Sequence, residues 1–88
     1  MVNMRKDFNI VTLEQLIEYC KNEIKDWDEL RWTHEKARRE YKELGMKTEA
    51  EDERSARDTA NENYKMWLAQ EDMLKALYAV ITGRKEYA

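Results

Sequence analysis

The chain has 88 residues, 42% apolar and 40% charged, with a formal net charge of −3. This length allows one small domain, and the composition is too apolar for a disordered chain and too charged for a compact mixed fold. With no proline and only two glycines, the chain is typical of long helices or coiled coils.

Three further features bound the class of protein. No stretch approaches the roughly 20 consecutive apolar residues of a transmembrane helix, and the N-terminal MVNMRKDFNIV lacks the apolar run of a signal peptide. The single cysteine cannot form a disulfide within the chain, so we expect a cytoplasmic protein. Acidic and basic residues alternate along the chain, which disfavours a one-sided basic face and makes duplex DNA an improbable partner.

The first helix is predicted over residues 12–44, after a short N-terminal segment of residues 1–11. TLEQ, starting at Thr12, fits a capping box, and Gly45 stands where a left-handed helix cap is needed. Apolar residues then recur at alternating spacings of three and four, which places them on one helix face. They are Leu13, Leu16, Cys20, Trp27, Leu30, Ala37, Tyr41 and Leu44, with Ile17 and Ile24 beside them.

A second helix is predicted over residues 48–82, because TEAE at its start is another capping box. Only three residues separate the two helices, so they must run antiparallel. In this register Trp27 faces Tyr64 and Ile17 faces Leu74. The fold class is therefore all-α, a single-domain antiparallel two-helix hairpin.

The second helix has more apolar surface than one partner helix can cover. Its main face includes Tyr64, Trp67, Leu74, Tyr78 and Ile81, and a second stripe consists of Met66, Ala69, Met73, Ala76 and Val80. We expect the N-terminal segment to fold back over part of this stripe and another copy of the chain to cover the rest. The predicted assembly is a homo-oligomer, in its simplest form a four-helix bundle of two hairpins.

No catalytic or metal-binding pattern is present. Cys20 and His34 are about 21 Å apart along one helix, too far for a nucleophile and its base. HEKAR, from His34, lacks the second histidine of the zinc-protease motif, and Arg31 stands where a Glu-x-x-His di-iron motif needs its Glu. We expect a protein that is not an enzyme and needs no metal or cofactor, with Cys20 a small buried residue.

A cluster of basic residues is the main candidate for ligand binding. Arg31, His34 and Arg38 follow one stripe of the first helix, and Arg54 and Arg57 approach from the second. Forked guanidinium donors near aromatic rings suit a phosphate or a nucleotide. The favoured alternative is that ion pairs across the hairpin neutralise the cluster. The acids available for this are Glu35, Glu40, Glu53 and Asp58.

Trp32 lies out of phase with the buried face and among charged residues. It can lie against Lys36 or Arg39 in a cation–π contact. It can equally anchor a protein partner together with them, because Trp and Arg dominate interface hot spots. The residues alone leave both interpretations open.

Residues 8–25, FNIVTLEQLIEYCKNEIK, carry a pattern of an aromatic, an aliphatic, Thr-x-Glu-Gln-aliphatic and Asn-x-Ile-Lys. The matching residues are Phe8, Val11, Thr12, Glu14, Gln15, Leu16, Asn22, Ile24 and Lys25. This stretch resembles the phage anti-CBASS sponges, helical-hairpin proteins that assemble into hexamers and sequester cyclic oligonucleotide messengers. The resemblance implies that Phe8 stacks on a base and that Lys25 contacts a phosphate.

Two functions are therefore expected from the sequence. The first is a non-enzymatic host-defence antagonist that sequesters a cyclic nucleotide messenger at subunit junctions. Its ligand residues would be Phe8, Lys25, Arg31, His34, Arg38 and Arg57. The alternative is a protein–protein inhibitor or adaptor that docks on a host protein through Trp32, Lys36 and Arg39.

Overall fold

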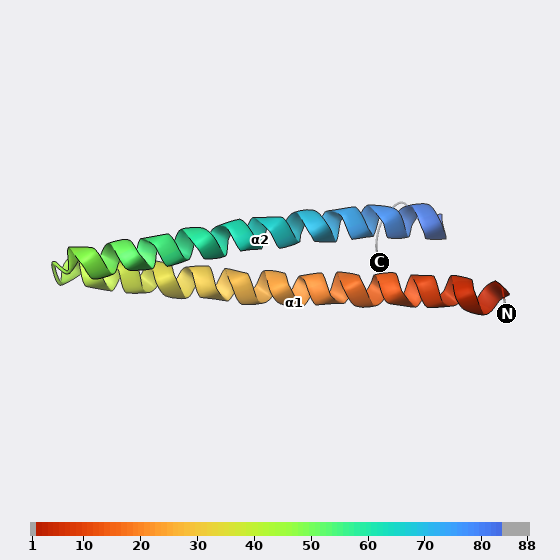
Figure 1. The fold of residues 1–88 in the computed structure, drawn as a ribbon, viewed down its shortest axis with the longest axis horizontal. Helices are drawn as coiled ribbons and strands as arrows, with labels where there is room; N and C mark the ends of the chain where they lie inside the picture. Colours follow the sequence, from red (N-terminus) through yellow and green to blue (C-terminus); the bar gives the residue numbers. More distant parts are fainter. Residues whose placement is uncertain (1, 84–88) are drawn as a thin grey trace.

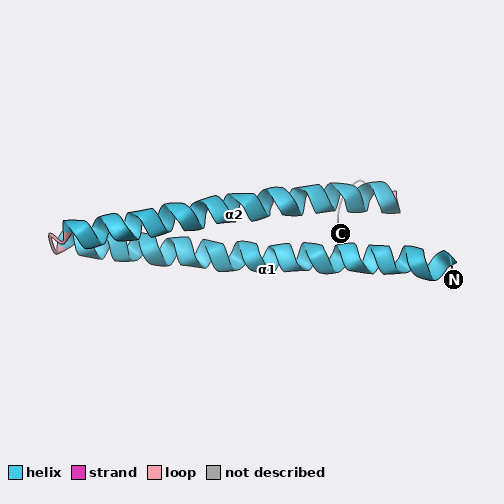
Figure 2. Ribbon diagram, in the orientation of Figure 1, coloured by secondary structure: helices cyan, strands magenta, loops and turns pink. Residues whose placement is uncertain are grey.

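The computed structural model describes residues 2–83, and the side chains of residues 12–83. This part of the chain forms two helices, α1 (Val2–Glu43) and α2 (Lys47–Thr82). They run antiparallel beside one another, and the start of α1 and the end of α2 lie opposite the turn (Figure 1). Helix and turn account for all of residues 2–83, in a hairpin 65 Å long (Figure 2). The predicted all-α hairpin is confirmed.

The turn at residues 44–46 is set by a glycine. Gly45 has a φ of 74°, in the left-handed region, as predicted. The Met46 N–H donates to the Tyr41 carbonyl at 2.9 Å, and the Gly45 N–H donates to the Lys42 carbonyl at 3.1 Å. These are the two hydrogen bonds of a Schellman motif, which satisfies the last carbonyls of α1 while reversing the chain.

The predicted start of the first helix is wrong, and the second helix starts one residue earlier than predicted and without the predicted cap. α1 begins at Val2 and passes through Thr12 without a break, so residues 2–11 neither form a separate segment nor fold back. No proline or glycine interrupts these residues, and nothing local ends a helix there. α2 begins at Lys47, with Met46 in the N-cap position and no side-chain cap, because the tight turn at Gly45 leaves no residue to spare before the helix.

The best-buried part of the hairpin lies toward its open end. Ile17 is completely buried, and Leu13 and Tyr78 are 7% and 6% exposed in the same cluster. Leu74 packs against this cluster, which confirms the predicted pairing of Ile17 with Leu74. Burying each such side chain contributes roughly 1.5–3 kcal/mol, so these few residues carry much of the packing energy.

The buried face of α1 is narrower than predicted. It is centred on Leu13, Ile17 and Cys20, whereas Leu16 and Leu30 are 44% and 40% exposed. Neighbouring residues on a helix point about 100° apart, and one partner helix covers only the stripe that faces it. Leu16 therefore turns outward beside the fully buried Ile17.

α1 also leaves one stripe of α2 uncovered, as predicted. Its members, Met66, Ala69, Met73, Ala76 and Val80, are all exposed in the hairpin. Between residues 2 and 83, neither helix has a stretch long and apolar enough to cross a bilayer.

Candidate functional site

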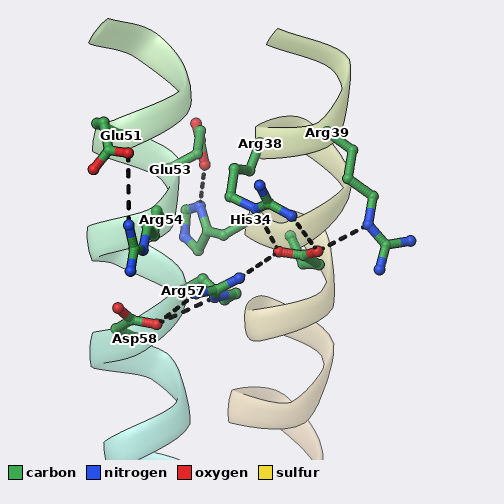
Figure 3. Close-up of polar contacts among 9 residues, drawn as sticks. His34, Arg38, Arg39, Glu51, Glu53, Arg54, Arg57 and Asp58 are labelled. Carbon is green, nitrogen blue, oxygen red and sulfur yellow. Dashed lines mark hydrogen bonds and ion pairs between the residues drawn. The ribbon is translucent and has the colours of Figure 1, made fainter. Parts of the chain in front are cut away.

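In the half of the hairpin near the turn, a network of ion pairs joins α1 and α2 and includes Arg38, Arg39 and Arg57 (Figure 3). Glu35 is only 9% exposed. Its Oε1 accepts hydrogen bonds from Arg38 Nε at 2.8 Å and Arg57 Nη1 at 2.7 Å. Its Oε2 accepts from Arg38 Nη2 at 2.9 Å and Arg39 Nε at 2.8 Å. One carboxylate thus gathers three guanidinium groups, two from α1 and one from α2.

These contacts keep every member of the group ionised. The hydrogen bonds from Arg38, then Arg57 and Arg39, hold the pKa of Glu35 well below its ordinary value of 4.5. Glu35 in turn raises the pKa of Arg38 and, with Asp58, that of Arg57. The interpretation that ion pairs across the hairpin neutralise the arginines is confirmed for Arg57, which binds Glu35 from α2. Arg38 is neutralised by the same carboxylate, but within α1.

The Arg31 guanidinium contacts a carboxylate, an amide and two aromatic rings. Its Nε donates to Asp28 at 2.7 Å, and its Nη1 donates to Asn61 Oδ1 on α2 at 3.0 Å. The guanidinium carbon lies 4.0 Å from the Tyr64 ring centroid and 5.9 Å from that of Trp32. Arg31 therefore acts as a clamp between the helices and, instead of the predicted Lys36 or Arg39, is the cation beside Trp32.

Three predicted ligand residues lie elsewhere. His34 Nδ1 donates to Glu53 Oε2 at 2.5 Å across the hairpin, and His34 lines neither cavity described below. Lys25 is exposed on α1, about 9 Å along the helix from Arg31. The side chain of Phe8 lies outside those that the structure describes, and its backbone is about 35 Å along α1 from Arg31. Within one chain, Lys25 and Phe8 are thus separated from the arginines along α1, whereas His34 lies among them but binds Glu53 (Figure 3).

A cavity of about 330 Å³, here called the arginine cleft, lies beside Glu35. Its lining is Arg31, Trp32, Glu35, Arg39, Arg57, Asp58 and Asn61. The structure thus joins Trp32 and Arg39, predicted as a partner surface, to Arg31 and Arg57, predicted as ligand residues. Lys36 is exposed and does not line the cleft.

Two side chains of the arginine cleft face outward. Trp32 is 58% exposed, and the Arg39 side chain is 65% exposed. Arg39 uses Nε to bind Glu35, while its two terminal nitrogens point away from that carboxylate (Figure 3). The cleft therefore offers an aromatic face beside a guanidinium whose outer edge is turned toward solvent.

Asn61 is the cleft residue that the sequence did not single out. The register could have indicated it, because Arg31 and Asn61 stand in the same pairing frame as Glu35 and Arg57. Its Oδ1 accepts from Arg31, which leaves its amide N–H groups as donors at the cleft.

A second cavity of about 730 Å³, here called the turn groove, lies next to the turn. Its lining is Arg38, Lys42, Gly45, Lys47, Ala50, Glu51, Arg54 and Arg57. Five of these residues are cationic and one is acidic. Lys42 and Lys47 were not singled out from the sequence, although their positions on either side of the predicted turn bring them together.

Cys20 is 2% exposed, as expected of a small buried residue. Burial first, and then Glu71 and Glu23, raise the pKa of its thiol, which makes it a poor nucleophile. Over the described part of the chain, no three His, Cys, Asp or Glu residues come together as metal ligands.

No protein-family model, curated protein or solved structure matches this chain, so its function is argued from the geometry of the two cavities.

Proposed function

We propose that the hairpin is a non-enzymatic binding protein that takes a nucleotide in the arginine cleft. The observation that carries this proposal is the exposed Trp32 beside the outward-facing guanidinium of Arg39. An exposed aromatic ring stacks on a base, worth about 1–3 kcal/mol per base. A guanidinium fork binds phosphate oxygens in pairs.

The cleft is organised for such a ligand before it binds. Glu35 holds the Nε edge of Arg39, so the other edge is presented with little freedom left to lose. Arg31 fixes Asn61 through its Oδ1, and the amide N–H groups of Asn61 are then placed to donate to a base or a sugar. Arg57 and Asp58, which also line the cleft, pair with one another.

Binding of this kind serves sequestration, and we propose a phage-type antagonist of host defence that captures a cyclic nucleotide messenger. The resemblance of residues 8–25 to the sponge family supports this role. Phe8 and Lys25, to which that resemblance assigns base and phosphate contacts, lie outside the cleft of their own chain. In the proposed assembly a second copy brings them to the same ligand, and the proposed site then lies between hairpins.

Self-association is the second part of this proposal. Met73 and Val80 on α2 are 67% and 79% exposed, in line with the exposed Met66. The chain exposes 6910 Å², whereas a compact monomer of 10.7 kDa exposes about 5,500 Å². The excess of about 1,400 Å² is more than the roughly 800 Å² that each partner buries in a standard interface.

The oligomer mass tests this second part. Sedimentation should give a dimer or a larger closed assembly, and a double Met73→Glu, Val80→Glu variant should be monomeric, because a buried carboxylate is costly. Glu62→Gln, a change on an exposed part of α2, is the control. A wild-type chain that stays monomeric at high micromolar concentration contradicts self-association.

Calorimetry with mononucleotides and with cyclic di- and trinucleotides tests the cleft. We expect binding that weakens about tenfold or more in Trp32→Ala, in line with the loss of one stacked base. Arg39→Gln should weaken binding of ligands with an accessible phosphate, and Lys65→Gln, which lies outside the cleft, should not. If none of these nucleotides binds at millimolar concentration, the proposal is wrong.

The alternative function is docking on a host protein through Trp32, Lys36 and Arg39. The exposed Trp32 next to Arg39 also favours this role, since both residue types are enriched at interface hot spots. Lys36 separates the two functions because it does not line the cleft. A Lys36→Ala change that weakens capture of a host protein but leaves nucleotide binding intact supports docking. Capture that survives Trp32→Ala removes the role of Trp32.

A further inference from the structure

The turn groove is a one-sided basic surface, which the alternating charges of the sequence disfavoured. Arg38 and Lys42 lie one helical turn apart on α1, and Lys47, Arg54 and Arg57 lie on the facing side of α2. Residues spaced by three, four or seven share a helix face, so folding collects these cations. Glu51 is the one carboxylate in the lining, and neighbouring acids in the sequence are absent from it.

The cations of the groove are only partly neutralised. Arg38 and Arg57 share Glu35, and Arg57 also binds Asp58. Arg54 Nη1 lies 3.7 Å from Glu51 Oε1, which is long for an ion pair, and both side chains are more than half exposed. Counting these three carboxylates against the five cations leaves a net charge of +2.

Lys42 and Lys47 account for the remaining charge. Within the part of the chain that the structure describes, neither lysine lies in an ion pair. Both are exposed, and they flank the turn at Gly45, one from each helix. Two like charges held at one groove repel each other, and an anion between them relieves that repulsion.

The lining indicates the kind of anion. Gly45 and Ala50 are its apolar members, so the groove lacks the aromatic or large aliphatic anchor that a protein partner needs. Arginine forks and lysine point charges together suit phosphate. The volume, about 730 Å³ against about 330 Å³ for the arginine cleft, leaves room for several linked phosphates.

We infer that the turn groove binds a linear oligophosphate, either as an inorganic chain or as the triphosphate tail of a nucleotide. Lys42 and Lys47 contact the oligophosphate, one from each helix. Arg54 leaves Glu51 and binds a phosphate oxygen instead. This site shares only Arg57 with the arginine cleft, so it stands independently of the proposed nucleotide site.

Titration calorimetry of the full chain with sodium tripolyphosphate and with orthophosphate tests the inference. Tripolyphosphate should bind at least about tenfold more tightly than orthophosphate, because it engages several cations at once. Binding should weaken with added salt, since the screening length falls from about 30 Å at 0.01 M to about 8 Å at 0.15 M ionic strength.

A double variant, Lys42→Gln with Lys47→Gln, should weaken tripolyphosphate binding about tenfold, the effect of losing two exposed ion pairs. Both lysines are exposed, so the variant should fold as the wild type does, and circular dichroism checks this. The matched control is Lys21→Gln with Lys65→Gln, which removes the same charge from exposed positions outside the groove. It should change binding by less than about twofold. Equal losses in the two double variants overturn the inference, because they indicate a nonspecific charge effect.

ATP and AMP distinguish the source of the phosphates and separate this site from the cleft. ATP binding that falls in the Lys42, Lys47 double variant, as tripolyphosphate binding does, places a nucleotide tail in the groove. AMP binding should depend on Trp32 and not on the two lysines. Tripolyphosphate that binds no more tightly than orthophosphate overturns the groove site, whatever AMP does. Tripolyphosphate binding without binding of AMP or of any cyclic nucleotide supports the groove site and contradicts the cleft site.

Discussion

Glu35 and Arg57 connect the two helices through a 2.7 Å hydrogen bond between Arg57 Nη1 and Glu35 Oε1, although 22 residues separate them in the chain. The Glu35 side chain is 11% exposed, so this contact is shielded from solvent on one side. Because Glu35 also binds Arg38 and Arg39, it orders Arg39 in the cleft, Arg38 in the turn groove, and Arg57, which lines both.

Replacing Glu35 with Gln should lower the free energy of unfolding by about 2 kcal/mol. The amide keeps the shape of the side chain but removes the charge that three guanidinium groups share, and their mutual repulsion is then uncompensated. Urea unfolding followed by circular dichroism measures the change. Glu62→Gln makes the same substitution on an exposed part of α2 and should cost less than about 0.5 kcal/mol. Equal stability of the two variants would show that the Glu35 contacts contribute nothing.

The same carboxylate predicts how stability depends on pH. Its pKa is lowered in the folded chain, chiefly by Arg38 and then by Arg57 and Arg39, from an ordinary value of 4.5. Below that pH the unfolded chain takes up a proton that the folded chain does not, so the contribution of Glu35 is complete above about pH 4.5 and is lost as the pH falls. The free energy of unfolding should therefore fall more steeply below pH 4.5 in the wild-type chain than in Glu35→Gln. Parallel acid profiles would contradict this assignment.

Ile17 and Leu16 form a matched pair for testing the buried face of α1. Ile17 is fully buried and Leu16 is 44% exposed. Ile17→Ala should cost about 3 kcal/mol, and Leu16→Ala less than about 1 kcal/mol. Urea unfolding at low protein concentration checks both. A large cost at Leu16 would mean that another surface covers it, in conflict with the exposure seen in the hairpin.

Replacing Gly45 with a residue that has a side chain should strain the backbone and destabilise the hairpin. Its φ of 74° is left-handed, and no atom lies within 4 Å of the position that a Cβ would take. Gly45→Ala should therefore cost about 1–2 kcal/mol without any steric clash, and Gly45→Asn less, because Asn adopts this conformation more readily. Thermal unfolding of the two variants gives the comparison. An alanine variant as stable as the wild type would show that the turn has another conformation.

Local patterns in the sequence were enough to predict the hairpin. Apolar spacing of three and four, a glycine between two periodic segments and a connection of three residues leave an antiparallel pair as the one arrangement. The pairing of Ile17 with Leu74 followed from counting outward from Gly45. Helix starts were less predictable. A capping box such as that at Thr12 stabilises a helix start but cannot end a helix that continues through it.

For the candidate site, only some of the member residues could be predicted from the sequence, and their contacts could not. The sequence indicated the arginines and Trp32, and it placed Arg38 with the ligand residues and Arg39 with the partner surface. In the hairpin Arg38 and Arg57 are tied to Glu35, while Arg39 keeps an outward edge beside Trp32. Which nitrogen of which arginine meets a carboxylate depends on side-chain directions across two helices, and one-dimensional spacing does not contain them.

The charges show most clearly what the sequence determines and what the tertiary structure decides. Along the chain, acids and bases alternate, and that order was sufficient to predict charged, helical, solvent-facing surfaces. The turn groove with its five cations exists only because α1 and α2 bring together one stripe from each side of Gly45. The physical reason is that the field at a surface depends on distances through space, which packing sets, and a net charge of −3 does not prevent a local excess of the opposite sign.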